Sequence, residues 1–331
     1  METALPVPAR TPAGNTATGW LKILALVFMF IDHAGKMLFP NVPEMRIIGR
    51  IAFPIYVWCM IVGFHYTRSV PKYLLRVLAV GIISQPLYYL ALHHEYEIGV
   101  KFSALLQNFS FPELGQFLRT LFVRPNIFLT LFLGLCAVWG VSSRKDPTHV
   151  LVPAAAAMIG AVLWIQFGWQ YALGFWLLAA LSVGICVLRK ADVEKNMARF
   201  LVPAAALILA TLQNTDYGWK GVLLFILLYA VRDSRPGIAA VMTAYFMFWG
   251  AAYSVTGSLF GLKFDVKKWP AFLSQPLSAL LRMETYALLS LPLILIRFKK
   301  DLKMPRWVGY AVYPAHLLLL YILELIFRQS A

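Results

Sequence analysis

Long apolar runs recur along the sequence from residue 20 to residue 327, with no polar stretch long enough for a soluble domain between them. A helix needs about 20 apolar residues to cross a hydrocarbon layer of roughly 30 Å. Segments near this length are 20–39, 47–66, 73–92, 126–141, 149–166, 171–188, 200–213, 219–231, 237–256, 275–296 and 307–327. We therefore predict an all-α membrane protein, a polytopic bundle of about 10–11 transmembrane helices.

The composition supports one membrane domain over 20–331. Hydrophobic residues make up 60% of the chain and charged residues only 14%, whereas soluble domains carry about 25% charged residues. The first apolar run is too long for the core of a signal peptide, so we interpret it as an uncleaved helix. Residues 1–19 are polar and rich in Ala, Pro and Thr, and we predict a disordered N-terminal tail there.

The formal charge of +15 comes from short basic clusters between apolar runs. Such clusters mark cytoplasmic loops in membrane proteins, and they accompany no base-reading motif. If the N-terminus is cytoplasmic, the inner loops hold nearly every cluster: 67–72, 142–148, 189–199, 232–236 and 297–306. We predict a multi-pass protein of the cytoplasmic (inner) membrane, N-terminus inside, that contacts membrane lipids and no nucleic acid.

Ionisable residues inside the first two apolar runs are candidate site residues, because charges in hydrocarbon are costly and usually functional. Asp32 and His33 are neighbours whose side chains point about 100° apart, so Asp32 is poorly placed to orient His33. Arg46 and Arg50 are four residues apart and share one helix face. We predict that Asp32 pairs with Arg46 or Arg50 and that His33 faces a cavity. The alternative is a buried ion pair and a hydrogen-bonded core histidine without catalytic function.

Polar groups recur in the last two apolar runs. Arg282 and Glu284 lie in the outer part of 275–296, and we assign them with Arg46 to the substrate side of the site. Tyr313 and His316 are one turn apart in 307–327, and Glu324 follows two turns later. Three cysteines show no metal-ligand spacing: Cys59, Cys136 and Cys186. We expect no metal site.

Basic residues also recur at the start of the third apolar run. Arg68, Lys72 and Arg76 are spaced at i, i+4 and i+8. The spacing fits the topology signal of an inner loop. It also fits a rim that binds the phosphates of coenzyme A, because Arg and Lys bind phosphates well.

The segment 93–125 is the longest connection between apolar runs. Phe109, Phe111 and Phe117 surround Pro112 within it. This pattern predicts an amphipathic piece that lies on the outer interface or over a site.

Several runs resemble the TraX family. They are LKILALVFMFIDHAGKMLFP, MRIIGRIAFPIYVWCMIVGFHYTRSVPKYLLRVLAVGIISQPLYYL, PNIFLTLFLGL, DYGWKGVLLFILLY and WVGYAVYPAHLLLL. The resemblance covers 20 to about 327 in order and implies a relative of proteins that acetylate the N-terminus of conjugative pilin. It also implies a relation to integral-membrane acyltransferases that modify glycans.

The resemblance implies roles for individual residues. His33 corresponds to the catalytic first-helix histidine, with Asp32 beside it, and Arg50 belongs to the GRIAFP motif. Tyr313 and His316 belong to the YPAHL motif, which we assign to cofactor binding. The implied acyl donor is acetyl-CoA, and the implied acceptor is a pilin or an envelope glycan.

These observations predict an acetyltransferase that moves acetyl from cytoplasmic acetyl-CoA to an amine or hydroxyl on the outer side. His33 acts as the base or carries the acetyl group itself, and Arg50 or a nearby donor stabilises the oxyanion. One alternative is a transporter or flippase of a small polar substrate, whose path the same residues line. Another is a non-catalytic subunit of a pilus or secretion assembly, in which these residues serve helix packing.

Overall fold

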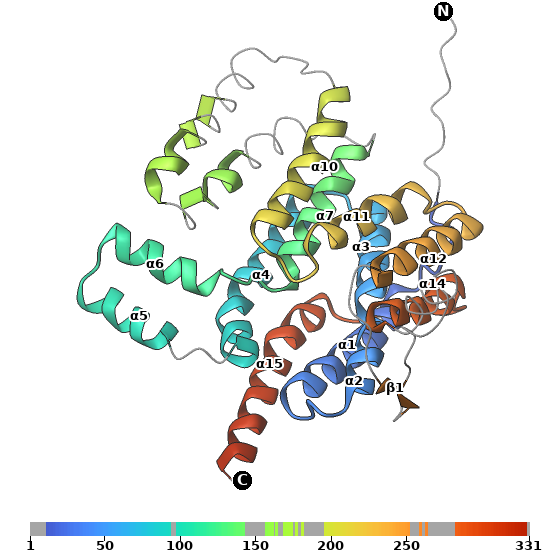
Figure 1. The fold of residues 1–331 in the computed structure, drawn as a ribbon. Helices are drawn as coiled ribbons and strands as arrows, with labels where there is room; N and C mark the ends of the chain where they lie inside the picture. Colours follow the sequence, from blue (N-terminus) through green and yellow to red (C-terminus); the bar gives the residue numbers. More distant parts are fainter. Residues whose placement is uncertain are drawn as a thin grey trace, which may run out of the picture.

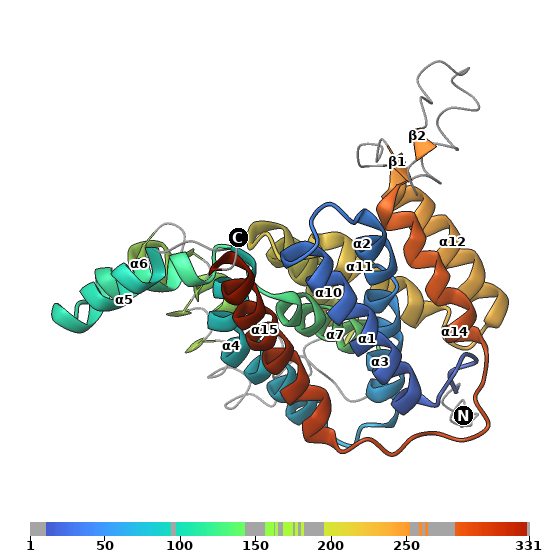
Figure 2. The same cartoon turned by 90° about the horizontal axis from the view of Figure 1, so that it is seen from below.

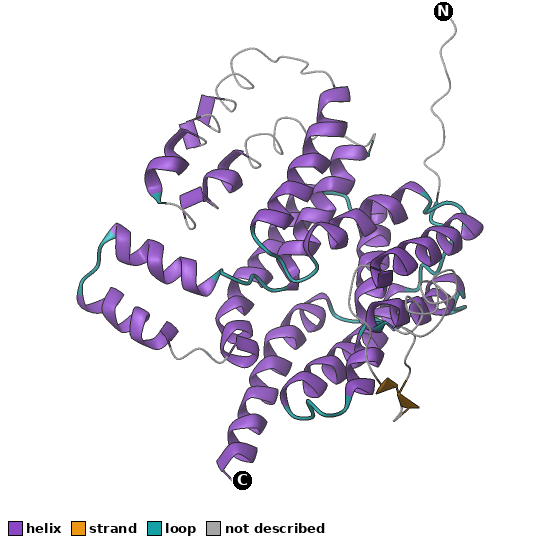
Figure 3. Cartoon of the chain, viewed as in Figure 1, coloured by secondary structure: helices purple, strands orange, loops and turns teal. Residues whose placement is uncertain are grey.

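The computed structural model describes residues 11–93, 97–142, 156–161, 163–164, 168–174, 176–177, 180–181, 195–251, 258–259, 262–263 and 282–329. Most of the expected helices 149–166 and 171–188, the start of 275–296 and Cys186 lie outside the described residues. In the described part the chain is almost entirely helical (Figures 1 and 3). A short antiparallel hairpin pairs β1 (Ser258–Leu259) with β2 (Leu262–Lys263).

Among the described residues, four helical segments are long and apolar enough to cross a membrane. They are α1 (Thr18–Met37), the segment Pro43–Tyr66, α4 (Val70–His93) and Val308–Phe327 within α15 (Arg306–Gln329). Shorter helices are α7 (Ile127–Val141), α10 (Lys195–Leu212), α11 (Gly218–Ala230), α12 (Arg235–Ala251) and α14 (Leu291–Leu295). The prediction of an all-α membrane protein is confirmed.

Two expected helices differ from the observed ones. The segment expected at 47–66 begins earlier, because Pro43 occupies a first-turn position where its missing N–H is not needed. It consists of α2 (Pro43–Gly49) and α3 (Ala52–Tyr66), with Arg50 directly after α2. Part of the helix expected at 275–296 is instead a 3₁₀ helix, η2 (Met283–Ser290), which leads into α14.

The core centres on α3 and α7. Each carries eleven buried residues and is apolar on all sides, as expected of helices surrounded by other elements. Helix α7 packs against α10, α11 and α4, whereas α1 packs against α2, α3 and α15. Helix α15 also lies along α4 (Figure 2). Thus α1, α3, α4 and α15 surround one region, where the cavity described below is found.

The segment expected to be an amphipathic piece forms two helices, α5 (Glu97–Gln107) and α6 (Phe111–Leu121), which project from the rest of the chain (Figure 1). Ser110 caps α6, its hydroxyl accepting from the backbone N–H of Glu113. Phe109 and Phe111 are 70% and 71% exposed at the tip between the helices. A location on the membrane interface stays a prediction.

Residues 12–17, part of the segment predicted to be a disordered tail, lie against α3 and the end of α14. The Trp58 indole donates to the carbonyl of Asn15 over 2.7 Å, and the N–H of Asn15 donates to the carbonyl of Ile294 over 2.6 Å. A Cβ on Gly14 would lie 2.5 Å from the Trp58 ring, so only glycine fits there. We call residues 12–17 the N-terminal strap.

Candidate active site

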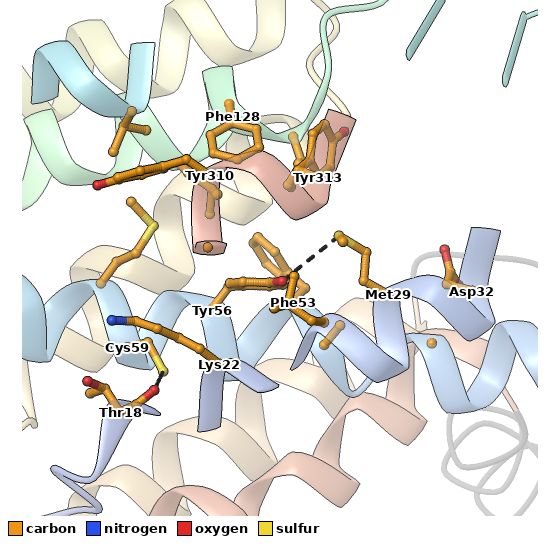
Figure 4. A pocket seen from close by; sticks show the side chains of 18 of the residues that line it. Thr18, Lys22, Met29, Asp32, Phe53, Tyr56, Cys59, Phe128, Tyr310 and Tyr313 are labelled. Atoms are coloured by element: carbon orange, nitrogen blue, oxygen red, sulfur yellow. Dashed lines mark hydrogen bonds between the residues drawn. The ribbon is translucent and has the colours of Figure 1, made fainter. Parts of the chain in front are cut away.

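One cavity of about 680 Å³ lies among α1, α3, α4, α7 and α15 (Figure 4). Helix α1 lines it from Thr18 to Lys36. These residues are 18 positions apart, which corresponds to about 27 Å along a helix. The cavity therefore follows a path nearly as long as the roughly 30 Å hydrocarbon layer.

The middle of the cavity is mostly apolar. Met29 and Phe53 line one wall, and Phe128 lies across from them (Figure 4). The Tyr56 hydroxyl points at the Met29 sulfur over 4.0 Å. This section offers an extended ligand apolar contact and few polar partners.

One end, which we call the Lys22 end, is formed by Thr18, Lys22, Lys303 and Tyr310. Asp301 lies there too, but its carboxylate accepts from the backbone N–H of Gly19 over 2.9 Å, in the first turn of α1. In the part of the chain that the structure describes, neither lysine forms an ion pair. The Lys22 end therefore offers two ammonium groups to an anion.

The opposite end, which we call the His33 end, holds the predicted ion pair. Asp32 accepts from Arg46 Nη1 over 2.6 Å, and Arg50 Nη2 lies 3.4 Å from its other oxygen. A Cβ on Gly49 would collide with the Asp32 side chain, so the absence of a side chain at 49 allows α2 to approach α1 this closely. The predicted pairing of Asp32 is confirmed, and both arginines take part.

His33 faces the same cavity but contacts a different partner. Its Nδ1 lies 2.7 Å from Nε2 of His316 on α15, with the two rings nearly parallel at 8°. His316 Nδ1 lies 3.0 Å from the carbonyl oxygen of Val312, one turn earlier. His316 is 5% exposed and does not line the cavity. The structure places His316 behind His33 and off the cavity wall. The cofactor-binding role that the YPAHL motif implies for it stays a prediction.

Asp216 and Tyr217, in the connection between α10 and α11, complete the His33 end. Desolvation by the surrounding protein raises the pKa of the Asp216 carboxyl, although the nearby charges of Arg50 and Lys36 act to lower it. The sequence-based prediction included neither residue, although both begin the DYGWKGVLLFILLY segment that carries the family resemblance. Spacing alone does not mark Asp216 as a site residue, and only the fold brings it to the arginines.

Several of the site residues predicted from the sequence lie outside the cavity wall. The basic residues at the start of the third apolar run, Arg68, Lys72 and Arg76, are exposed. Arg76 Nε donates to the carbonyl of Lys72 over 3.1 Å. Arg282 and Glu284 do not line the cavity either, although η2 packs against α2 and Glu284 lies within electrostatic range of Arg50. Tyr313 does line it, as expected for a ligand contact.

Lys22 is a cationic residue of the cavity that the sequence-based prediction missed. It precedes His33 by eleven residues, about three helical turns, so the two share one face of α1. That spacing is visible in the sequence. Among the described residues, no group of three or more His, Cys, Asp or Glu side chains is arranged to hold a metal ion.

Comparison with known proteins supports the resemblance noted in the sequence. The family model described as "TraX protein" matches residues 17–179 and 173–324. Over 119 residues the chain is 32% identical to the uncharacterized protein RP591 of Rickettsia prowazekii, which covers 36% of this chain and 35% of that protein. Over 152 residues it is 27% identical to the probable fimbrial assembly protein FimC, serogroup H1, of Dichelobacter nodosus, which covers 45% of this chain and 55% of that protein. The matches thus span about a third and about half of these relatives. No solved structure matches the chain.

Proposed function

Because this chain belongs to the TraX family, which is linked to pilus and fimbrial assembly, we propose that it is a membrane-embedded acetyltransferase. It moves an acetyl group from cytoplasmic acetyl-CoA to an acceptor amine or hydroxyl on the outer side of the inner membrane. The acceptor is a pilin N-terminus or an envelope glycan. The relative from Dichelobacter nodosus, a probable fimbrial assembly protein, supports the link to pili.

The observation that carries this proposal is the cavity that follows α1 between two chemically different ends. Lys22 and Lys303 suit the phosphates of coenzyme A at one end, and the apolar middle suits its extended pantetheine arm. Lys22 and His33 are eleven residues apart, about 16 Å along the helix, which is comparable to an extended pantetheine chain. This arrangement favours the Lys22 end over Arg68, Lys72 and Arg76 as the phosphate-binding rim.

His33 supplies the acid–base chemistry at the other end. As the acceptor nitrogen or oxygen attacks the acetyl carbonyl carbon, His33 takes the proton that the acceptor loses. When the carbon–sulfur bond breaks, His33 returns this proton to the departing sulfur, so a free thiol leaves. The imidazole is thereby restored without any other reactant.

Arg50 is the cation best placed to stabilise the negative charge that develops on the carbonyl oxygen. The short contact of Asp32 is with Arg46, at 2.6 Å, whereas its contact with Arg50 is 3.4 Å, beyond usual hydrogen-bond length. Arg50 thus keeps capacity for an additional acceptor. Fixed donors aimed at a developing oxyanion are often the largest contribution to catalysis of this kind.

The test is transfer of radiolabel from acetyl-CoA by the purified full-length protein in detergent, with and without envelope extract. We expect transfer by wild type and its loss in His33→Ala. His65→Ala is the matched control, because His65 lies on α3 and does not line the cavity. Both variants must elute as folded protein.

Full transfer by folded His33→Ala would refute the role of His33. Absence of acetyl-CoA binding and turnover in wild type would refute the acetyltransferase itself. The polar groups would then belong to a transport path or to a packing network in an assembly subunit.

A further inference from the structure

The contacts of His316 determine where the protons of both imidazoles lie. A carbonyl oxygen only accepts hydrogen bonds, so His316 Nδ1, 3.0 Å from the Val312 oxygen, carries a proton. In a neutral ring the other nitrogen, Nε2, is then an acceptor. At 2.7 Å the partner nitrogen must donate. His33 Nδ1 therefore carries its proton, and His33 Nε2 holds the lone pair.

The charged surroundings of His33 fit this neutral pair. Three cations lie within electrostatic range of His33: Lys36 on its own helix, Arg46 on α2 and Arg50 directly after α2. The carboxylate of the adjacent Asp32 contacts the two arginines instead. Neutral imidazoles suit a site with this many cations, because another positive charge would be repelled.

The remaining nitrogen of His33 is available to a substrate. His33 lines the cavity, whereas His316 does not. In the part of the chain that is described, no hydrogen bond is formed by His33 Nε2, and the hydrogen bond to His316 involves Nδ1. The acceptor's proton therefore has one nitrogen to which it can move.

We propose that His316 is a positioning residue that keeps the proton of His33 on Nδ1 and so makes Nε2 the reactive nitrogen. It plays the part that a carboxylate plays for the histidine of a hydrolase triad, here with a neutral imidazole anchored on the α15 backbone. Its catalytic meaning rests on the proposed acetyl transfer. The protonation pattern itself does not depend on that reaction.

Kinetics of two variants separate positioning from packing. His316→Leu fills the position with an apolar side chain that offers no acceptor, whereas the side-chain oxygen of His316→Gln can accept the Nδ1 proton of His33. We expect kcat of the Leu variant to fall about a hundredfold, within the range that general bases contribute. The Gln variant should recover at least about tenfold of that loss, and KM for acetyl-CoA should stay within about twofold in both.

Equal loss of kcat in the two variants, or a change confined to KM, would overturn the proposal, because a packing or ligand-binding role predicts either result. A measurement on the wild-type protein tests the same proposal without any substitution at 316, so it decides even where both variants fail to fold.

¹⁵N NMR of histidine-labelled protein reads the protonated nitrogen directly and needs no activity. The chain contains six histidines, and the His33 signals are those lost in His33→Asn. We expect a protonated Nδ1 and an unprotonated Nε2 on His33 in wild type. The reverse pattern would refute the positioning role. If wild type shows the expected protonation of His33 but transfers no acetyl group, the proposed function is refuted and the protonation pattern still holds.

Discussion

Neutralising Asp32 should destabilise the protein through the two arginines that remain. In Asp32→Asn, Arg46 and Arg50 keep their charges although their side chains are only 25% and 14% exposed. Removing one partner of a buried ion pair costs about 3–5 kcal/mol. Both arginines border the cavity, where water can reach them, so we expect the lower end, about 3 kcal/mol of unfolding free energy.

The two arginines should contribute unequally. The contact between Arg46 and Asp32 is 2.6 Å and that between Arg50 and Asp32 is 3.4 Å. Double-mutant cycles with Arg46→Gln and Arg50→Gln should therefore give coupling free energies of about 2–3 kcal/mol and under about 1 kcal/mol, respectively.

The assay is unfolding of the detergent-solubilised protein in increasing SDS, followed by the fluorescence of its ten tryptophans. Glu44→Gln is the control, because Glu44 on α2 forms no ion pair in the described part of the chain. It should change the free energy by no more than about 0.5 kcal/mol. An equally small change in Asp32→Asn, or equal couplings to both arginines, would refute this reasoning.

Two further predictions concern the path along the cavity. Lys22→Ala should raise KM for acetyl-CoA about tenfold with little change in kcat. The control is Lys72→Ala, on the exposed surface, which should leave both constants near wild type. A higher KM in Lys72→Ala than in Lys22→Ala would favour the phosphate-binding rim predicted from the basic spacing. Leu26→Trp places a large ring in the middle of the cavity and should reduce the initial rate of acetyl transfer at least about tenfold. The control is Leu75→Trp, at a residue that is 66% exposed, which should not reduce this rate. Equal initial rates in the two tryptophan variants would show that the cavity is not the route of the acyl donor.

The sequence predicts the long helices well because each is an uninterrupted apolar run. The expected segments 20–39 and 73–92 correspond closely to α1 and α4. Periodicity could not predict the interruption after Gly49, since apolar residues continue on both sides of it. Nor does composition distinguish the 3₁₀ helix η2 from an α-helix.

The site was predictable where it depends on local spacing. Asp32 is followed closely by Arg46 and Arg50, four residues apart in the next apolar segment, so helical spacing was enough to predict their pairing. The contact of His33 with His316 depends on how α15 packs against α1, which no local pattern encodes. The cluster around Lys72 is ambiguous in the sequence, because basic residues that orient a membrane protein look the same as basic residues that bind phosphate.

The contact between the two histidines also bears on how the protein is made. They are 283 residues apart in the sequence, an interval of roughly 15–60 s at ordinary rates of translation. Arg46 and Arg50 follow Asp32 by only 14 and 18 residues, so we expect its charge to be neutralised soon after it enters the bilayer. His33 gains its partner His316 only after α15 has been synthesised and has packed against α1. We therefore expect a stage of insertion in which the ion pair of Asp32 is complete, but His33 has neither its partner nor a finished cavity around it. If His33 is the base that we propose, the chain is inert until α15 docks.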